Sequence, residues 1–390
     1  VTTITNNITL KPWPGTTAHG PVQVDGNPNG ATGVGPTCLW ISDVSNVVVE
    51  EITFHRWSWT TPSITSSPPG QAAVYLGEHN AGSGISNITL LNCTMSAVDG
   101  GAYGVYSASG SSGTNTGISD VNCFLTGTVN DAPLGGFGTH FASTYNSIIS
   151  GSTYRGWDTV GVLFSADGLS GGNALKQSEI SDCRNMAFMQ DNQQQCQVEN
   201  NLMFSNGNSV SGHTILFEGE IAGSTYYYNT IVQTGSVSDH MIDFATATFA
   251  GTVFFYNNVY RLGTDGTRAI YRFSDAAQPG SAKFNSDNNL FSLVEFSGSD
   301  IVYDFIATEE GTPIFYPRLF LAPDDWNGAY GDDANSEEAH GLAPGIFVDG
   351  PGLDFHLDPG SPAIGNAVDV SIYVDKEGDV RPSGAESLYD

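Results

Sequence analysis

The sequence contains a strand–turn–strand phrase that recurs along most of its length. One clear pair of copies reads ISNITLLNCTMS at residues 85–96 and ISDVNCFLTG at residues 118–127. With the polar turn residue as the anchor, the copies fall at Asn92, Asn122, Gly151, Asp182, Asn200, Asn229, Asn257 and Asn288. The intervals between these anchors are 30, 29, 31, 18, 29, 28 and 31 residues. A repeat of this length, built from short β segments without helical periodicity, indicates coils stacked along one axis.

The 18-residue interval limits what one coil can contain. It is long enough for three short strands and their turns, but too short for a strand–helix–strand unit. We therefore predict an all-β solenoid of about nine to eleven coils. Coils are expected over residues 1–294, and residues 295–390, where the repeat is lost, are expected to form final coils with a long excursion and a C-terminal cap in the same continuous domain.

The charge balance excludes several classes of partner. The chain has 41 acidic and 12 basic residues, for a formal net charge of -29. Nucleic acids and anionic membranes bind basic patches, so neither is an expected partner. No apolar run is long enough to span a bilayer. No metal site is predicted, because clustered Cys and His spacing is absent; no cofactor is expected, although the acidic, asparagine-rich loops leave Ca²⁺ open as a ligand.

Two features favour an extracellular protein. The numbering begins at Val1 without a methionine, which suggests that a leader has been removed or that the front of a longer protein is missing. Three glycosylation sequons begin at Asn7, Asn87 and Asn92. At Asn92, a turn anchor, a glycan would fit only if the side chain points outward.

The five cysteines are too few for a disulfide framework. Cys93, Cys123 and Cys183 each follow an anchor residue, so we expect them at equivalent places in their coils, about 4.8 Å apart in adjacent coils. Small buried thiols in an internal row are favoured over a disulfide, which stays open as the alternative.

A row of large side chains in residues 44–59 marks a possible binding surface. Ile52 and Phe54 are expected in the core, so by the two-residue period of a strand His55, Trp57 and Trp59 should face outward. Outward tryptophans suit contact with a sugar ring or a partner protein. The alternative is that the following loop, TTPSITSSPPGQ, covers them.

The C-terminal region resembles a known superfamily. The resemblance rests on Trp326, Asp333–Ser336, the APGIFVD phrase at 343–349, the DFHL phrase at 354–357, the GSPAI phrase at 360–364, and the DKEG phrase at 375–378 followed by Arg381 and Pro382. These phrases resemble the closing segment of secreted right-handed parallel β-helix repeat proteins of the pectate-lyase-like superfamily. The resemblance implies a right-handed parallel β-helix for the whole chain. It implies no single function, because the superfamily includes lyases, glycosidases, epimerases, adhesins and structural proteins.

The sequence lacks the phrases of the superfamily's best-known catalytic sites. The paired-carboxylate glycosidase phrases and the Trp-x-Asp-His phrase of pectate lyases are missing. A third type resembles a Lys base with an Arg acid that faces a uronate carboxylate. The best candidates for such a site are Lys176, Arg155, His140 and Arg184.

Two functional interpretations follow. The first is an extracellular structural or adhesive subunit, a rod or filament that associates with copies of itself through its coil ends, with glycan binding as a further property. The second is a secreted carbohydrate-active enzyme, a polysaccharide lyase or glycosidase, with a groove on the middle coils and an extracellular polysaccharide as its partner. A phage or virus tail protein is a third interpretation with the same fold.

Overall fold

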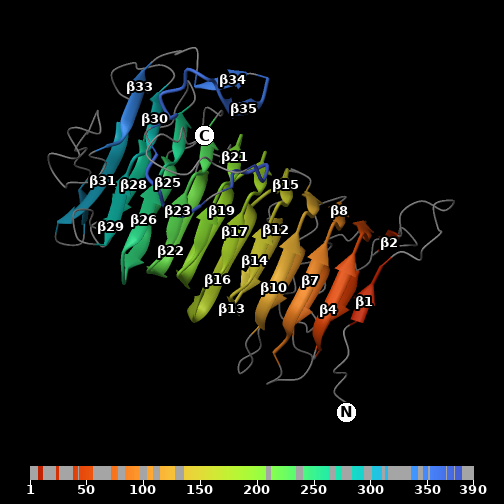
Figure 1. Ribbon diagram of the computed structural model, residues 1–390. Coiled ribbons are helices and arrows are strands. Elements are labelled where there is room, and N and C mark those ends of the chain that lie inside the picture. Colours follow the sequence, from red (N-terminus) through yellow and green to blue (C-terminus); the bar gives the residue numbers. More distant parts are fainter. Residues whose placement is uncertain are drawn as a thin grey trace. The chain divides into compact units, whose positions relative to one another are not determined.

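The computed structural model consists of short strands wound into coils (Figure 1). It describes residues 8–11, 23–25, 38–55 except 43, 72–77, 84–96, 103–108, 115–127, 136–207, 212–233, 240–262, 269–274, 283–293, 301–309, 312–314, 335–340, 346–349, and 352–379 except 366 and 373. These residues contain strands and turns and no helix, and the strands form three long parallel sheets, here called A, B and C. The predicted all-β parallel β-helix is therefore confirmed.

The chain divides into two compact units. Unit 1 comprises Val1–Arg184 and Phe188–Gln193, and unit 2 comprises Asn185–Ala187 and Gln194–Asp390. Strand β19 (Met186–Gln194) contains the boundary.

In unit 1 successive coils each add one strand to each sheet. Sheet A runs in the order β1 (Ile8–Leu10), β4 (Ser45–Glu50), β7 (Ser86–Leu91), β10 (Asn115–Val121), β14 (Ile148–Ser150) and β17 (Ala174–Lys176), with β13 (Thr144–Tyr145) also paired to β10. Sheet B runs β2 (Gln23–Asp25), β5 (Thr53–His55), β8 (Thr94–Ser96), β11 (Phe124–Thr126), β15 (Thr153–Arg155) and β18 (Glu179–Ser181). Sheet C runs β3 (Leu39–Ile41), β6 (Ala72–Gly77), β9 (Tyr103–Ala108), β12 (Phe137–Ala142) and β16 (Val160–Gly171).

Unit 2 repeats this plan. Sheet A runs β20 (Gln197–Glu199), β23 (Thr225–Tyr227), β26 (Val253–Tyr256) and β29 (Phe284–Asp287). Sheet B runs β21 (Leu202–Phe204), β24 (Thr230–Val232), β27 (Val259–Leu262), β30 (Leu290–Leu293) and β33 (Glu337–His340). Sheet C runs β22 (His213–Ile221), β25 (His240–Phe249), β28 (Ala269–Ser274) and β31 (Ile301–Glu309), with β32 (Thr312–Ile314) antiparallel to β31.

The turn from sheet A to sheet B explains the repeated phrase. Its first residue has a positive φ, which asparagine and glycine tolerate better than other residues. The residues in this position are Glu51, Asn92, Asn122, Gly151, Gln177, Asn200, Tyr228, Asn257 and Asn288. The predicted anchor Asn229 is therefore off by one residue, because Tyr228 has the positive φ. Asp182 also has a positive φ but follows β18 of sheet B, so it closes a different turn. The 18-residue coil predicted from it is wrong, and the shortest such interval is the 23 residues from Gln177 to Asn200.

The residue after this turn points inward and forms a polar ladder. In unit 2 the ladder consists of Asn201, Asn229, Asn258 and Asn289, all buried. Each of the first three side chains is hydrogen-bonded to the next asparagine, at 2.9–3.1 Å. The ladder satisfies buried backbone groups at the corner of each coil.

In unit 1 two cysteines occupy the corresponding place. Cys93 and Cys123 are buried, unoxidised thiols that donate to backbone carbonyls at 3.4–3.5 Å. Cys183 is also a buried free thiol, but it follows the turn after sheet B, so the prediction of three equivalent cysteines holds for two of them. Burial raises the pKa of Cys183 to about 12, which keeps it protonated.

Aromatic rings fill the interior of unit 2. Phe217, Phe244 and Phe273 stack from coil to coil, with centroids 4.4 and 5.1 Å apart and interplanar angles of 14° and 4°. None of the three is exposed. Such ring pairs contribute beyond the area that they bury.

The C-terminal residues lie along the side of unit 2. The antiparallel hairpin of β34 (Phe347–Asp349) and β35 (Asp354–Leu357) packs on the outer face of sheet B, against Phe204, Val232, Val259 and Leu290. Farther on, the backbone of Val368 forms two hydrogen bonds with the Asn257 side chain, at 2.7 and 2.8 Å. The described hairpin thus covers an outward apolar row of sheet B, and the C-terminal cap stays a prediction.

Candidate functional site

Three of the four predicted catalytic candidates lie on different sheets of unit 1, and Arg184 lies in the turn after β18. His140 belongs to β12 of sheet C, Arg155 ends β15 of sheet B, and Lys176 ends β17 of sheet A. Leu175 is buried, so by strand alternation Lys176 faces outward from its own sheet. Side chains on the outer faces of three sheets point in three directions, so the arrangement does not support a shared catalytic site.

The arginines among these candidates are engaged in ion pairs at the surface. Arg155 Nε lies 3.0 Å from Asp182 Oδ2, and Arg184 Nη1, in the turn after β18, lies 3.1 Å from Asp158 Oδ1. Exposed pairs of this kind contribute little to stability and leave the cation neutralised. They are typical of a solvated surface.

The predicted glycan-contact residues are only partly described. His55 ends β5 on sheet B and is half-buried, while Ile52 and Phe54 are buried, as expected. Trp57 and Trp59 lie outside the described residues. Asn87 and Asn92, which begin two of the three sequons, are both exposed. Asn7, which begins the third, lies outside the described residues.

Sheet C of unit 1 has an outer face rich in aromatic side chains. Trp40, Tyr75, Tyr106 and His140 occupy one register row across β3, β6, β9 and β12. A second row places Tyr103 beside Phe137. Together these six residues are called the aromatic ridge.

The strand sequences place the ridge residues outward. Val74, Val105 and Thr139, which precede the Tyr75, Tyr106 and His140 positions, are fully buried. The residues that follow, Leu76, Ser107 and Phe141, are buried as well. The interior of these coils is thus filled by other side chains, so the core does not require the ridge.

Glycines hold the strands of the ridge close to the interior. A Cβ atom on Gly138 would lie 2.3 Å from the carbonyl oxygen of Gly161 and 2.5 Å from the Tyr154 ring. A Cβ on Gly104 would lie 2.6 Å from the carbonyl oxygen of Gly138. No side chain fits at these two positions without a shift of backbone. The glycines therefore let Tyr103 and Phe137 leave the strand outward.

The rings of the ridge contact one another across coils. Tyr103 stacks on Phe137 at 5.1 Å and on Tyr106 at 4.5 Å, and Tyr106 lies 5.7 Å from Tyr75. The stacked and tilted arrangement means that neighbouring rings cover part of each other's faces. Apart from the buried Tyr75, the ridge residues are half-buried.

His140 is the one imidazole in this cluster of rings. Its ring lies 5.1–5.8 Å from those of Tyr103, Tyr106 and Phe137, and its Nε2 lies 2.7 Å from Ser165 Oγ. Its Nδ1 has no hydrogen-bond partner among the described residues. Desolvation by the surrounding rings lowers the pKa of His140 to about 3, so the imidazole is neutral at physiological pH. Desolvation likewise raises the pKa of Tyr103 to about 12.

The outer face of sheet C in unit 2 is charged. His213 Nε2 lies 3.2 Å and Arg272 Nη1 3.4 Å from the same oxygen of Asp243, while His213 Nδ1 lies 3.3 Å from the carbonyl oxygen of His240. Desolvation lowers the pKa of His213. Both ring nitrogens of His213 thus lie within hydrogen-bonding distance of groups of the protein itself. This cluster is a buried ion-pair network.

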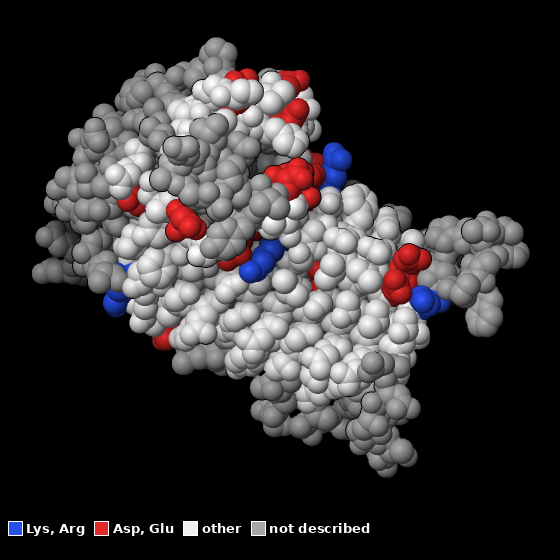
Figure 2. Space-filling model, in the orientation of Figure 1, with Lys and Arg blue, Asp and Glu red and all other residues white. Residues whose placement is uncertain are grey.

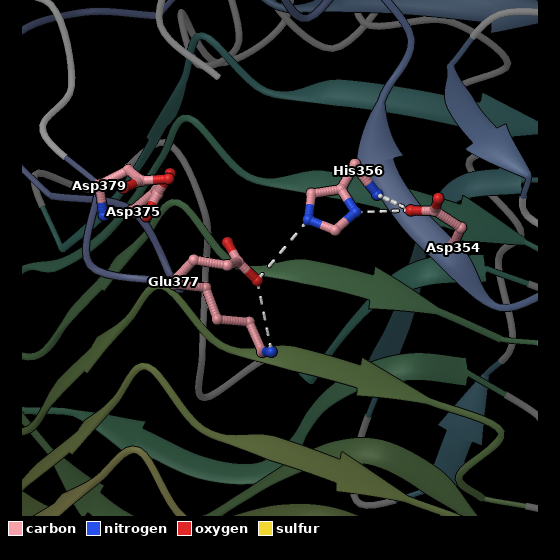
Figure 3. Close-up of polar contacts among 6 residues, drawn as sticks. Asp354, His356, Asp375, Glu377 and Asp379 are labelled. Atoms are coloured by element: carbon pink, nitrogen blue, oxygen red, sulfur yellow. Dashed lines mark hydrogen bonds and ion pairs between the residues drawn. The ribbon is translucent and has the colours of Figure 1, made fainter.

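A third polar cluster links the C-terminal hairpin to the turn at residues 375–379 (Figure 3). His356 Nδ1 lies 2.5 Å from Asp354 Oδ1, and its Nε2 lies 3.9 Å from Glu377. The hydrogen bond to Asp354 raises the pKa of His356 and lowers that of Asp354. The side chains are exposed, so the cluster is a surface ion pair that joins two parts of the C-terminal segment.

Sequence reasoning selected His140 but missed the other five residues of the ridge. The row could have been found in the strand sequences AAVYLG, YGVYSA and FGTHFA. The fourth residue of each is a tyrosine or a histidine. The turn-anchor alignment did not include these segments, because they belong to the third strand of each coil. Aligning the third strands with each other reveals the row.

The described residues contain neither a metal site nor a membrane-spanning helix. No group of three His, Cys, Asp or Glu side chains in them is arranged to hold a metal ion. These described residues also contain no helix that is long and apolar enough to cross a membrane.

Comparisons with known proteins show likeness only at the level of solved structures. No family model and no curated protein matches the chain. One similar structure is a complex of XylC with xylose, at 8% identity and a TM-score of 0.38, covering 70% of this chain and 49% of that chain. A lacto-N-biosidase from Eubacterium ramulus has 12% identity and a TM-score of 0.41, covering 70% and 50%. The Dettilon tailspike protein has 11% identity and a TM-score of 0.39, covering 69% and 55%.

The chain spans about half the length of these three structures. At such identities and TM-scores the likeness supplies no argument for function, which has to come from the side chains themselves.

Proposed function

We propose that this protein binds carbohydrate through the aromatic ridge on the outer face of sheet C in unit 1. The observation that supports the proposal is the set of half-buried rings in register across consecutive coils, on a face that the core does not need. Tyrosine and tryptophan combine an apolar body with a polar tip, and a sugar presents C–H groups beside hydroxyls. A ridge of ring edges and phenol hydroxyls matches that mixture.

The composition of the ridge favours a glycan over a nucleic acid. Strands β6, β9 and β12 contain no Lys, Arg, Asp or Glu. Binding to a phosphate backbone needs cations, and the whole chain has 12 of them against 41 acidic residues. Trp57 and Trp59, which the sequence predicts as sugar contacts, lie outside the described residues, and the proposal does not depend on them.

The proposal is for binding and does not include catalysis. Lys176, Arg155 and His140 leave three different sheets, and no described residue supplies a base next to the ridge with a pKa near neutrality. The proposal includes an extracellular location, which the exposure of the two described sequon asparagines, Asn87 and Asn92, supports. Assembly into a rod or filament gains no specific support from the described residues.

A glycan array followed by calorimetry tests the proposal. Tyr106→Ala, in the middle of the ridge, is expected to weaken binding of the best array ligand about tenfold or more, from the loss of one aromatic contact. Thr89→Ala, on sheet A of the same unit, serves as the control and should bind as the unchanged protein does. Equal affinity of Tyr106→Ala and Thr89→Ala for every array ligand, or no ligand on the array, would refute the proposal.

A further inference from the structure

Strands β6, β9 and β12, which carry five of the six ridge residues, contain no Lys, Arg, Asp or Glu in a chain that is otherwise strongly acidic. The eighteen residues of β6, β9 and β12 include one titratable group besides tyrosine, which is His140. On the face of the molecule in view in Figure 2, the described residues are mostly uncharged, and the acidic and basic side chains lie in a few separate places. A ligand on the ridge therefore meets no cation there.

The groups that surround His140 keep it uncharged. From β9 it faces Tyr103 and Tyr106, from its own strand Phe137, and from β16 Ser165. None of these is a carboxylate that would stabilise an imidazolium, and the rings exclude the water that would solvate one. The Tyr103 phenol is neutral as well, because desolvation by burial raises its pKa.

A carboxylate or sulfate group placed on this face would lose hydration without gaining a partner. Transfer of an unpaired anion to an apolar environment costs much more than transfer of a hydroxyl, which the phenol tips and Ser165 can hydrogen-bond. The field of the whole chain, at a formal net charge of -29, adds repulsion. Both effects act against anionic saccharides and leave uncharged ones unaffected.

We infer that the aromatic ridge is selective for uncharged saccharide chains and rejects uronic-acid and sulfated ones. This inference rests on the proposed function and adds the substrate class. This inference differs from the predicted uronate-binding site at Lys176 and Arg155. The ridge would recognise the hydroxyls and C–H groups of a sugar, whereas that site would have recognised a carboxylate. His140 stays a neutral ring among the aromatic side chains, with its Nε2 hydrogen-bonded to Ser165 Oγ.

The test uses matched ligand pairs on one array. Each neutral hexasaccharide is printed beside the same chain oxidised at C6 to the uronic acid, and the best pair is then measured by calorimetry at low salt and at about 0.5 M NaCl. We expect the neutral member to bind at least about tenfold more tightly, with less than about twofold change between the two salt concentrations, because aromatic contacts are not screened.

A charge introduced into the ridge gives an independent measurement. Phe137→Lys places one cation beside His140 and should narrow or reverse the preference for the neutral member, in a salt-dependent way. Phe137→Leu is the matched control, and circular dichroism with thermal unfolding verifies that both variants fold. If Phe137→Lys does not fold, the measurements on the unchanged protein at the two salt concentrations still test the preference for uncharged saccharides.

The outcomes separate the two proposals. Tighter binding of the acidic member, weakened by salt and by Tyr106→Ala, would overturn the inference about substrate class and keep the ridge as a glycan site. Absence of any saccharide whose binding depends on Tyr106 would overturn the proposed function itself. Preference for the neutral member that vanishes in Tyr106→Ala supports both.

Discussion

Asp120 is a carboxylic acid inside the coils of unit 1. It is fully buried and accepts hydrogen bonds from Tyr154 at 2.6 Å, Ser152 at 3.0 Å and Thr139 at 3.3 Å. Desolvation nevertheless raises its pKa, because three neutral hydroxyls do not replace the hydration of an anion. A single residue thus makes the interior of these coils sensitive to pH.

We expect the stability conferred by Asp120 to fall as pH rises. Its folded-state pKa lies above the unfolded value of about 3.9, so its favourable contribution is complete below that value and is lost as the pH passes through the raised folded pKa. Urea unfolding at several pH values should show the unchanged protein losing stability relative to Asp120→Asn as the pH increases over this range.

Asp182→Asn is the control for that experiment, because Asp182 is an exposed carboxylate of the same unit paired with Arg155. The difference in unfolding free energy between Asp182→Asn and the unchanged protein should not show the trend expected for Asp120→Asn over the same pH range. A constant difference between Asp120→Asn and the unchanged protein at all pH values would contradict the proposed burial cost.

At the scale of one element, the asparagine ladder fastens the corners of unit 2. Asn229 donates to the carbonyl oxygen of Val198 at 2.9 Å and to Asn258 Oδ1 at 3.0 Å. It also accepts from the backbone N–H of Asn201 at 3.1 Å and from the Asn201 side chain at 2.9 Å. One side chain therefore satisfies groups in the coils on both sides of its own.

Asn229→Ala should lower the free energy of unfolding by about 3 kcal/mol, since it leaves buried donors and acceptors without partners. Guanidinium unfolding monitored by fluorescence measures the change. Gln197→Ala, at an exposed position on β20, should stay within about 0.5 kcal/mol of the unchanged protein. Equal destabilisation by the two substitutions would show that the ladder contributes nothing specific.

At the scale of the whole molecule, the C-terminal segment covers apolar surface of unit 2 that the coils leave outward. Phe355 lies 5.2 Å from Phe204 and 5.4 Å from Phe347, and the guanidinium of Arg261 lies 5.8 Å from the Phe347 ring. Partial burial lowers the pKa of Arg261. Without the hairpin, an apolar row on sheet B would face solvent, a liability for an extended sheet.

Phe355→Ser should release this hairpin. We expect faster proteolysis in residues 346–379 and increased self-association in light scattering, together with a stability loss of about 3 kcal/mol or more from the lost aromatic burial. Val348→Ser is the matched control, because Val348 lies in the same hairpin but is 54% exposed. Identical proteolysis of the two variants would mean that Phe355 does not fasten the segment.

The sequence by itself determined the all-β coil architecture of this protein. Turn residues that tolerate a positive φ and alternating apolar side chains are local properties, so they can be read from the residues, as the anchors Asn92, Asn122 and Asn257 show. The same reasoning placed Ile52 and Phe54 in the core and Cys93 and Cys123 as buried thiols.

Only the tertiary structure decided which residues meet. Asp182 and Gln177 both occupy positive-φ turns, and their sequence context does not say which one closes sheet A. The ridge unites Tyr75, Tyr106 and His140 because loops of unequal length bring their strands into one register. Contacts between coils depend on that register, which no local preference of the chain encodes. The apolar row of sheet B likewise acquired its cover from residues more than fifty positions away in the sequence, through packing.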